Sequence, residues 1–259
     1  MDDHRPLRTF GRTKARTLKP RQAALVETLL PHLAVDVSAE IDVHALFPSS
    51  LAEEGSGEAG RSNDQAPEQL SAPHPPTPSP QGRGGVVLEI GFGGGEHLVA
   101  QAAAHPNARF IGVEPFLNGV ASCLRHIEES GVTNVRLHQG DARDVMARLP
   151  DASLDLCYIL FPDPWPKLRH HKRRLIQPDF LAELARVLKP GAEVRFATDW
   201  ANYAAWTLEH FTRHPRFVWT AERAADWQNS WPGHVQTRYE QKRLGDCAPV
   251  WLRFVRASA

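Results

Sequence analysis

Apolar and polar positions between residues 86 and 214 follow two patterns that alternate along the chain. Short, largely apolar runs, which are typical of buried parallel strands, occur at 86–90 and 154–160, and further strand-like segments occur at 109–113, 135–139 and 193–198. Apolar residues at helical spacing, which predict helices, occur at 96–105, 177–188 and 200–214. Strands that alternate with helices in this way indicate an α/β fold with a mostly parallel sheet.

The end of the chain has a different pattern. Residues 236–242 and 250–255 are strand-like runs, joined by a Leu-Gly-Asp turn at 244–246. Because turn residues between two such runs favour antiparallel pairing, we expect a C-terminal antiparallel hairpin. On this pattern alone, the polar residues of the first run fit an exposed strand face as well as a binding site.

Composition divides the 259-residue chain into three segments. Residues 1–48 form a basic N-terminal arm and a short helical segment, and residues 86–259 carry the α/β pattern. Between them, residues 49–85 are rich in Pro, Gly, Ser and Glu and have almost no large apolar side chains, so they cannot build a core. We therefore expect a folded domain at 86–259 that follows a flexible or partly polyproline linker.

The sequence shows no signal of a membrane or secreted protein. No run of about 18 apolar residues would span a bilayer, and the first residues lack the apolar core of a secretory signal. Cys123, Cys157 and Cys247 are an odd number of cysteines without Cys-x-x-Cys spacing, which suggests neither a disulfide framework nor a zinc site. We expect a soluble, cytoplasmic protein with buried, unreactive thiols and with no metal and no membrane partner.

The first apolar run ends in a glycine-rich turn at 91–95, and a helix follows it. Gly91 and Gly93 let the backbone approach a ligand where any Cβ atom would clash, next to the free N–H groups of the helix. Glu114 ends the second strand about 20 residues later, where a carboxylate can accept both hydroxyls of a ribose. Asp141 follows the third strand, where an acid could meet an adenine amine. Together they fit an adenosine cofactor, although ordinary helix caps and turns use the same residue types.

The fourth strand ends in Phe-Pro-Asp-Pro-Trp-Pro-Lys at 161–167. Prolines on both sides of Asp163 restrict its backbone and prevent the segment from continuing as a helix or a central strand. Trp165 offers a ring on which an exposed base could stack. The alternative is a rigid loop that packs on the core, but packing alone does not explain an acid between two prolines followed by a run of cations.

The chain has no net charge, with 30 basic and 30 acidic residues, yet two stretches are strongly basic. Residues 4–26 contain seven cations and no acid, and residues 167–174 read Lys-Leu-Arg-His-His-Lys-Arg-Arg beside the predicted cofactor edge. Such clusters favour a polyanion, because each phosphate that they neutralise releases counterions. Both could instead be solvated surface, and the first also resembles an organelle transit segment.

Five motifs together identify a family that the chain resembles. They are Leu-Glu-Ile-Gly-Phe-Gly at 88–93, Phe-Pro-Asp-Pro-Trp at 161–165, Arg-His-His-Lys-Arg-Arg at 169–174, Ala-Thr-Asp-Trp at 197–200 and Thr-Arg-Tyr-Glu at 237–240. In this order they resemble the bacterial tRNA (guanine-N7)-methyltransferase family. The resemblance implies a Rossmann-like class I methyltransferase fold, with a mostly parallel seven-stranded sheet and helices on both faces. It also implies S-adenosylmethionine as the methyl donor and N7 of a guanine in the tRNA variable loop, usually at position 46, as the acceptor.

The same motifs imply roles for individual residues, with Asp163 as the catalytic residue. Cofactor contacts are implied for glycines and acids at the strand ends: Glu89, Gly91, Gly93, Glu114, Asp141 and Asp163. Substrate contacts are implied for a second group: Lys167, Asp199, Thr237, Arg238, Tyr239 and Glu240. An RNA-binding loop is implied for six consecutive residues: Arg169, His170, His171, Lys172, Arg173 and Arg174.

The chain departs from the family pattern in two places. The insertion at 47–85 has no counterpart in the usual compact pattern, and Pro166 stands where relatives often have His, which argues against a required imidazole there. Three other classes stay open: a methyltransferase acting on an exocyclic amine, a nicotinamide-dependent oxidoreductase and a non-catalytic RNA-binding protein. The oxidoreductase lacks an evident second domain, and the RNA-binding protein leaves three ordered acids without a role. We favour a monomer with tRNA as its partner.

Overall fold

The computed structural model describes residues 17–47 and 84–258. The predictions for residues 1–16 and for most of the linker, residues 49–83, lie outside the described residues. The boundaries of the three segments therefore stay predictions.

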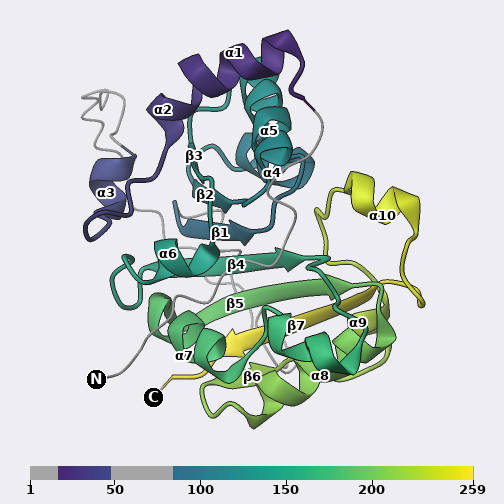
Figure 1. The fold of residues 1–259 in the computed structure, drawn as a ribbon. Coiled ribbons are helices and arrows are strands. Elements are labelled where there is room, and N and C mark those ends of the chain that lie inside the picture. Colours follow the sequence, from purple (N-terminus) through teal and green to yellow (C-terminus); the bar gives the residue numbers. More distant parts are fainter. Residues whose placement is uncertain (1–16, 48–83, 259) are drawn as a thin grey trace, which may run out of the picture.

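A seven-stranded sheet forms the centre of the structure, in the strand order β3-β2-β1-β4-β5-β7-β6 (Figure 1). The strands are β1 (Val86–Ile90), β2 (Arg109–Val113), β3 (Val135–His138), β4 (Leu154–Leu160), β5 (Leu188–Thr198), β6 (Phe217–Trp219) and β7 (Val250–Arg256). The first five are parallel, and β7 runs antiparallel between β5 and β6. The predicted α/β fold with a mostly parallel sheet is confirmed.

Helices cover both faces of this sheet, which explains why its central strands are largely apolar. The main helices are α4 (Glu96–Ala104), α5 (Leu117–Ser130), α6 (Ala142–Met146), α7 (Pro178–Val187) and α8 (Ala201–Arg213). Leu88 of β1 belongs to a core with α6, α7 and α8, whereas its neighbour Val87 belongs to a core with α4 and α5. Successive residues of one strand thus bury their side chains in opposite cores.

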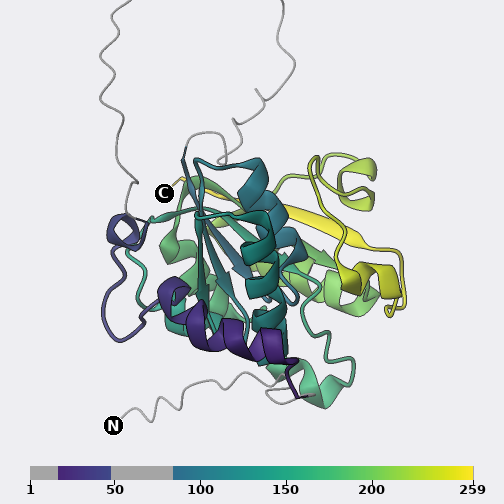
Figure 2. The same ribbon diagram turned by 90° about the horizontal axis from the view of Figure 1, so that it is seen from above.

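The N-terminal segment packs on this body through α1 (Pro20–Thr28), α2 (Leu30–Leu33) and α3 (Val43–Leu46). Figure 2 shows α1 against α5, and Leu25 and Leu33 join the core on that side. Val35 donates a backbone hydrogen bond of 2.9 Å to Leu137 O on β3. The described residues before the insertion therefore share hydrophobic cores with the rest of the chain.

The predicted C-terminal hairpin is wrong in its first strand. Residues 238–242 form a helix, α10 (Arg238–Lys242), and β7 pairs instead with β5 and with β6, a strand that the sequence pattern did not reveal. Thr237 and Glu240 form a capping box: the Thr237 side chain accepts from Glu240 N at 3.3 Å, and Glu240 Oε2 accepts from Thr237 N at 2.7 Å. This Thr-x-x-Glu cap stabilises a helix start against the weak strand pattern.

The expectation of buried thiols holds for Cys123 and Cys157 but is wrong for Cys247, which is partly exposed. Within the described ranges, no helix has the length and apolar character needed to span a membrane. In the same ranges, no group of three or more His, Cys, Asp and Glu side chains converges to hold a metal ion.

Candidate active site

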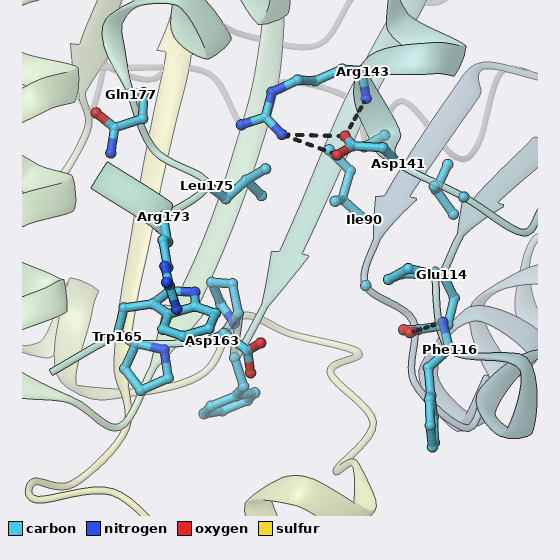
Figure 3. Close-up of a pocket in the computed structure, with 18 of the residues that line it drawn as sticks. Ile90, Glu114, Phe116, Asp141, Arg143, Asp163, Trp165, Arg173, Leu175 and Gln177 are labelled. Atoms are coloured by element: carbon cyan, nitrogen blue, oxygen red, sulfur yellow. Dashed lines mark hydrogen bonds and ion pairs between the residues drawn. The ribbon is translucent and has the colours of Figure 1, made fainter. Parts of the chain in front are cut away.

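A pocket of about 830 Å³ opens at the carboxyl ends of the parallel strands (Figure 3). Ligand pockets typically measure about 300–1,000 Å³, so a nucleoside-sized ligand fits this space. Its walls come from the segments after four neighbouring strands: 90–91, 113–116, 140–143 and 161–166. Because β1 lies between β2 and β4, the pocket sits where the chain order of the parallel strands reverses. Such reversal points are the usual ligand sites of open α/β sheets.

The glycine turn borders this pocket through Gly91. Gly91, Gly93 and Gly95 all have positive φ angles, of 75°, 56° and 82°, which other residues adopt at a cost. Gly119 in the first turn of α5 faces this turn, and a Cβ atom there would lie 2.4 Å from Gly93 O. Helix α5 therefore reaches the turn because residue 119 has no side chain.

Glu114 joins the end of β2 to this turn. Its Oε2 accepts a hydrogen bond of 2.9 Å from Gly93 N, and its Oε1 accepts one of 2.9 Å from Phe116 N. The residue is 8% exposed, and burial raises the pKa of its carboxyl, while the two N–H donors offset part of that rise and the charge of Asp163 adds to it. Each oxygen keeps a further lone pair, so both could accept hydroxyl groups from the pocket.

Asp141 has a place in the pocket wall and also a structural contact, while its cofactor contact stays a prediction. It lines the pocket and also caps α6, since its Oδ1 accepts from Arg143 N at 3.0 Å. The Arg143 guanidinium lies 3.2 Å from its other oxygen, and Figure 3 shows this pair above the pocket. A ligand at this wall would meet a charge-paired carboxylate rather than a free one.

Glu89 lies behind the pocket, and its contact is to the protein. The residue is 2% exposed, and its Oε2 is 2.8 Å from Nδ1 of the buried His97 on α4. The predicted cofactor contact of Glu89 stays a prediction, because its side chain does not form part of the pocket wall.

Asp163 lies on a strained loop at the edge of the pocket, residues 161–166, which we call the Asp163 loop. Phe161 and Trp165, on either side of it, have φ angles of 51° and 44°, which bulky residues adopt rarely. With Pro162 and Pro164 also fixing the backbone, the loop has few alternative conformations. Figure 3 shows the Asp163 carboxylate facing across the pocket from the side opposite Glu114 and Phe116. Strain of this kind concentrates at functional sites.

Comparisons with known proteins show which family the chain resembles. Residues 83–251 match a family model described as "Putative methyltransferase". A solved SAM-dependent O-methyltransferase from Thermotoga maritima aligns with a TM-score of 0.47 at 13% identity, over 70% of this chain and 62% of that one. A protein named tRNA (guanine-N(7)-)-methyltransferase from Caulobacter sp. (strain K31) is 52% identical, over 98% of this chain and 96% of that protein. A protein of the same name from Hyphomonas neptunium is 44% identical, over 96% of this chain and 99% of that protein. The chain belongs to the tRNA (guanine-N(7)-)-methyltransferase family.

The basic motif of this family forms a 3-10 helix, Leu168–Arg173, beside the pocket. Lys172 and Arg173 line the pocket, and the Arg173 guanidinium lies 5.0 Å from the centre of the Trp165 ring. Desolvation and the neighbouring cations lower the pKa of His170, which therefore adds little charge at neutral pH. Arg169 and Lys172 are exposed and able to meet a polyanion.

Arg174 differs in burial from the other residues of the predicted RNA-binding loop. The residue is 1% exposed, whereas the motif places it next to exposed cations. Its guanidinium turns inward and donates to Pro164 O and to Asn202 Oδ1. The sequence could not show this, because six adjacent basic residues carry no sign of which side chain turns inward.

Of the predicted substrate residues, Tyr239 contacts the Asp163 loop directly, and Asp199 is linked to the loop through Tyr239. Asp199 follows β5, is 4% exposed, and accepts from Gly245 N at 2.9 Å and from the Tyr239 hydroxyl at 3.4 Å. The Tyr239 ring lies 5.5 Å from the ring of Phe161. Tyr239 therefore connects Asp199 to the loop that carries Asp163. Lys167 lies exposed at the start of the basic helix.

The other predicted substrate residues contact the protein itself. Glu240 is 9% exposed and points back into the capping box, where His234 Nε2 lies 3.0 Å from both of its oxygens. Burial alone would raise the pKa of Glu240, but hydrogen bonds from His234 and Thr237 outweigh it and lower that pKa. Arg238 forms an ion pair of 2.8 Å with Glu96 at the start of α4. Substrate contacts by these residues stay predictions.

Helix α4 links the two halves of the site through residues that the sequence did not single out. Gln101 Nε2 donates to Gly233 O at 2.7 Å, and the His97 ring lies 5.6 Å from that of His234. With the Glu96–Arg238 pair, these contacts fix the segment before α10 against the helix that starts at the glycine turn. No spacing rule marks His97 or His234 among the 13 histidines of the chain.

The close approach of α5 to the glycine turn yields a stability prediction. We expect Gly119→Ala to lower the free energy of unfolding by about 1–3 kcal/mol, because the clash with Gly93 O outweighs the gain that alanine gives a helix. Urea unfolding measures this. Ser122→Ala in the same helix serves as the control and should change stability little; a Gly119→Ala variant as stable as wild type would contradict the prediction.

Proposed function

We propose that this protein transfers a methyl group from S-adenosylmethionine to N7 of a guanine in the variable loop of tRNA, usually at position 46. The observation that carries the proposal is the rigid Asp163 loop, which faces the buried Glu114 across one pocket. Family membership and the exposed cations beside this pocket support it. Such an enzyme would work where tRNA is, in the cytoplasm.

The residues of the pocket fit the adenosine part of the donor. Glu114 is buried yet has its charge compensated by two backbone N–H groups, which leaves lone pairs for ribose hydroxyls. Gly91 and Gly93 provide backbone without side chains, and Asp141 stands at the wall where an adenine would lie. When bound, the donor supplies a methyl group on a positively charged sulfur.

The acceptor chemistry explains why the site needs geometry more than a base. Guanine N7 has an in-plane lone pair and no proton at neutral pH, so it attacks the methyl carbon without prior deprotonation. A new N–C bond forms as the C–S bond breaks, its electron pair stays on sulfur, and the positive charge passes to the base. In-line positioning at roughly 3 Å is worth several kcal/mol of the barrier.

Asp163 fits a role in orientation and charge stabilisation rather than proton abstraction. Its carboxylate faces the pocket, where it could accept hydrogen bonds from a guanine edge and favour the positive charge that develops there. Trp165, covered on one side by Arg173, offers a ring near the same edge for stacking an extruded base.

Asp163→Asn and Asp163→Ala test this assignment. We expect single-turnover methylation of unmodified tRNA to slow by about 100-fold or more, as for the loss of one preorganised electrostatic contact. Mass spectrometry of the nucleosides should identify 7-methylguanosine with the wild type, and a methylated exocyclic amine would overturn the proposed acceptor. Asp144→Asn, at an exposed acid on α6, is the control; equal rates in all four proteins would remove Asp163 from the chemistry.

The raised pKa of Glu114 predicts a pH dependence of donor binding. Because the pKa of this carboxyl is raised above its ordinary value of 4.5, we expect donor affinity to fall as pH decreases, with a midpoint above 4.5. The protonated acid is a poorer acceptor for ribose hydroxyls, so affinity is full above the midpoint and lost below it. Calorimetry between pH 4 and 7 measures the effect. Glu114→Gln should bind weakly at every pH, and a full pH step in that variant would assign the titration elsewhere.

The salt dependence of tRNA binding tests the exposed cations. Lys172→Ala should weaken tRNA binding and reduce the slope of log K against log salt by about 1, as for one lost phosphate contact. Donor affinity should fall less than tRNA affinity. Arg213→Ala, on the exposed far end of α8, is the matched control. A Lys172→Ala variant with the wild-type slope would show that this side chain does not meet the RNA.

A further inference from the structure

Arg174 is a buried cation whose partners are neutral. Its Nε donates to the backbone carbonyl of Pro164 at 2.9 Å, and its Nη2 donates to Asn202 Oδ1 at 2.6 Å. The guanidinium carbon lies 4.9 Å from the centre of the Tyr203 ring and 5.1 Å from that of Trp206. Burial lowers the pKa of this guanidinium, but an arginine stays charged at neutral pH. Burying a charge beside neutral partners costs free energy, so we expect the contacts of Arg174 to have a role that offsets this cost.

The contacts of Arg174 join two parts of the proposed site. Pro164 directly follows Asp163, and Asn202 stands in the first turn of α8, three residues after Asp199. One side chain therefore fixes the backbone next to the proposed catalytic acid to the helix that follows a proposed substrate acid. The segment after Arg174 is fixed as well, since Trp206 Nε1 donates to Ile176 O at 2.8 Å.

The Asp163 loop requires such an external restraint. Phe161 and Trp165 hold positive φ angles, and conformations of this kind persist only where surrounding contacts determine them. Arg174 reaches a carbonyl between these two strained residues and so resists relaxation of the loop. The guanidinium of Arg173, the preceding residue, lies 5.0 Å from the centre of the Trp165 ring, and both residues line the pocket.

We infer that Arg174 is a positioning residue that holds Asp163 in its methyl-transfer geometry and does not contact RNA. The inference rests on the proposed function, because it assigns Arg174 to that reaction. Arginine suits the role better than lysine. Its planar fork donates to two acceptors in fixed directions and packs flat on rings, whereas an ammonium group does neither.

Arg174→Lys and Asn202→Ala test the inference in the full-length protein. With Arg174→Lys we expect the single-turnover rate at saturating tRNA and donor to fall by about 100-fold, because a misplacement of 1 Å can cost that much. With Asn202→Ala the fall should be about tenfold or less, since the Pro164 and ring contacts remain. In both variants the tRNA dissociation constant and its salt slope should stay within twofold of wild type. Lys172→Ala is the contrasting variant, with a changed slope.

A second measurement does not depend on activity. Amide hydrogen exchange in residues 160–167 should become faster in both variants, while exchange in β1 stays unchanged. Asn202 is exposed on a helix surface, so its replacement by alanine leaves the fold intact even if Arg174→Lys unfolds the protein. Glu209→Ala, exposed on the same helix, is the matched control and should leave exchange in the loop unchanged.

The outcomes separate the two hypotheses. A lower tRNA affinity and a salt slope reduced by about 1 in Arg174→Lys or Asn202→Ala, with the saturated rate and loop exchange unchanged, would restore Arg174 as an RNA contact and overturn the inference. Unchanged rate, affinity and loop exchange in Asn202→Ala would also overturn it. A wild-type protein that binds tRNA but methylates no guanine would instead refute the proposed function, whatever the exchange data show.

Discussion

The hydrogen bond from Gly93 N to the Glu114 carboxylate is the interaction on which the site depends. It joins the turn after β1 to the end of β2 and sets the spacing of the pocket between them. A carboxylate buried there would ordinarily be unfavourable, but two backbone N–H groups offset part of that cost. Because Gly119 lets α5 reach the same turn, the main chain surrounds this acid without filling the pocket. The contacts that offset part of this cost therefore also shape the ligand site.

Helix α4 extends this constraint to the other side of the site. It begins at the glycine turn, and its side chains hold the segment before and within α10 through Glu96, His97 and Gln101. The buried Glu89–His97 and His234–Glu240 pairs face each other through their rings. Packed pairs of this kind transmit displacement because interiors are close-packed. The proposed donor side and the proposed substrate side are thus parts of one rigid arrangement rather than two independent loops.

The sequence predicted those features that follow from period and spacing. A strand covered on both faces is largely apolar, which predicts β1 at 86–90, and the distance from the glycine turn predicts the place of Glu114. The strand prediction at 236–242 is wrong because Thr237 and Glu240 form a Thr-x-x-Glu cap, which stabilises a helix start in the same residues. The burial of Arg174 and His97 could not be predicted from the sequence. A polar side chain is buried when residues from distant segments contact it, and local composition does not indicate those residues.

The strained Asp163 loop suits a reaction in which no proton must be removed. Two bulky residues at positive φ cost of order 1–3 kcal/mol each, and the structure offsets this with contacts around the loop. Phe161 packs against Tyr239 and against the edge of Trp251, and Arg174 binds the carbonyl of Pro164. Guanine N7 carries no proton that must be removed, so the reaction needs no general base with a tuned pKa. An acid that orients a purine gains most from a position that does not relax, because the barrier then contains little cost of alignment. The rigidity of the loop therefore favours orientation of the purine as the contribution of Asp163.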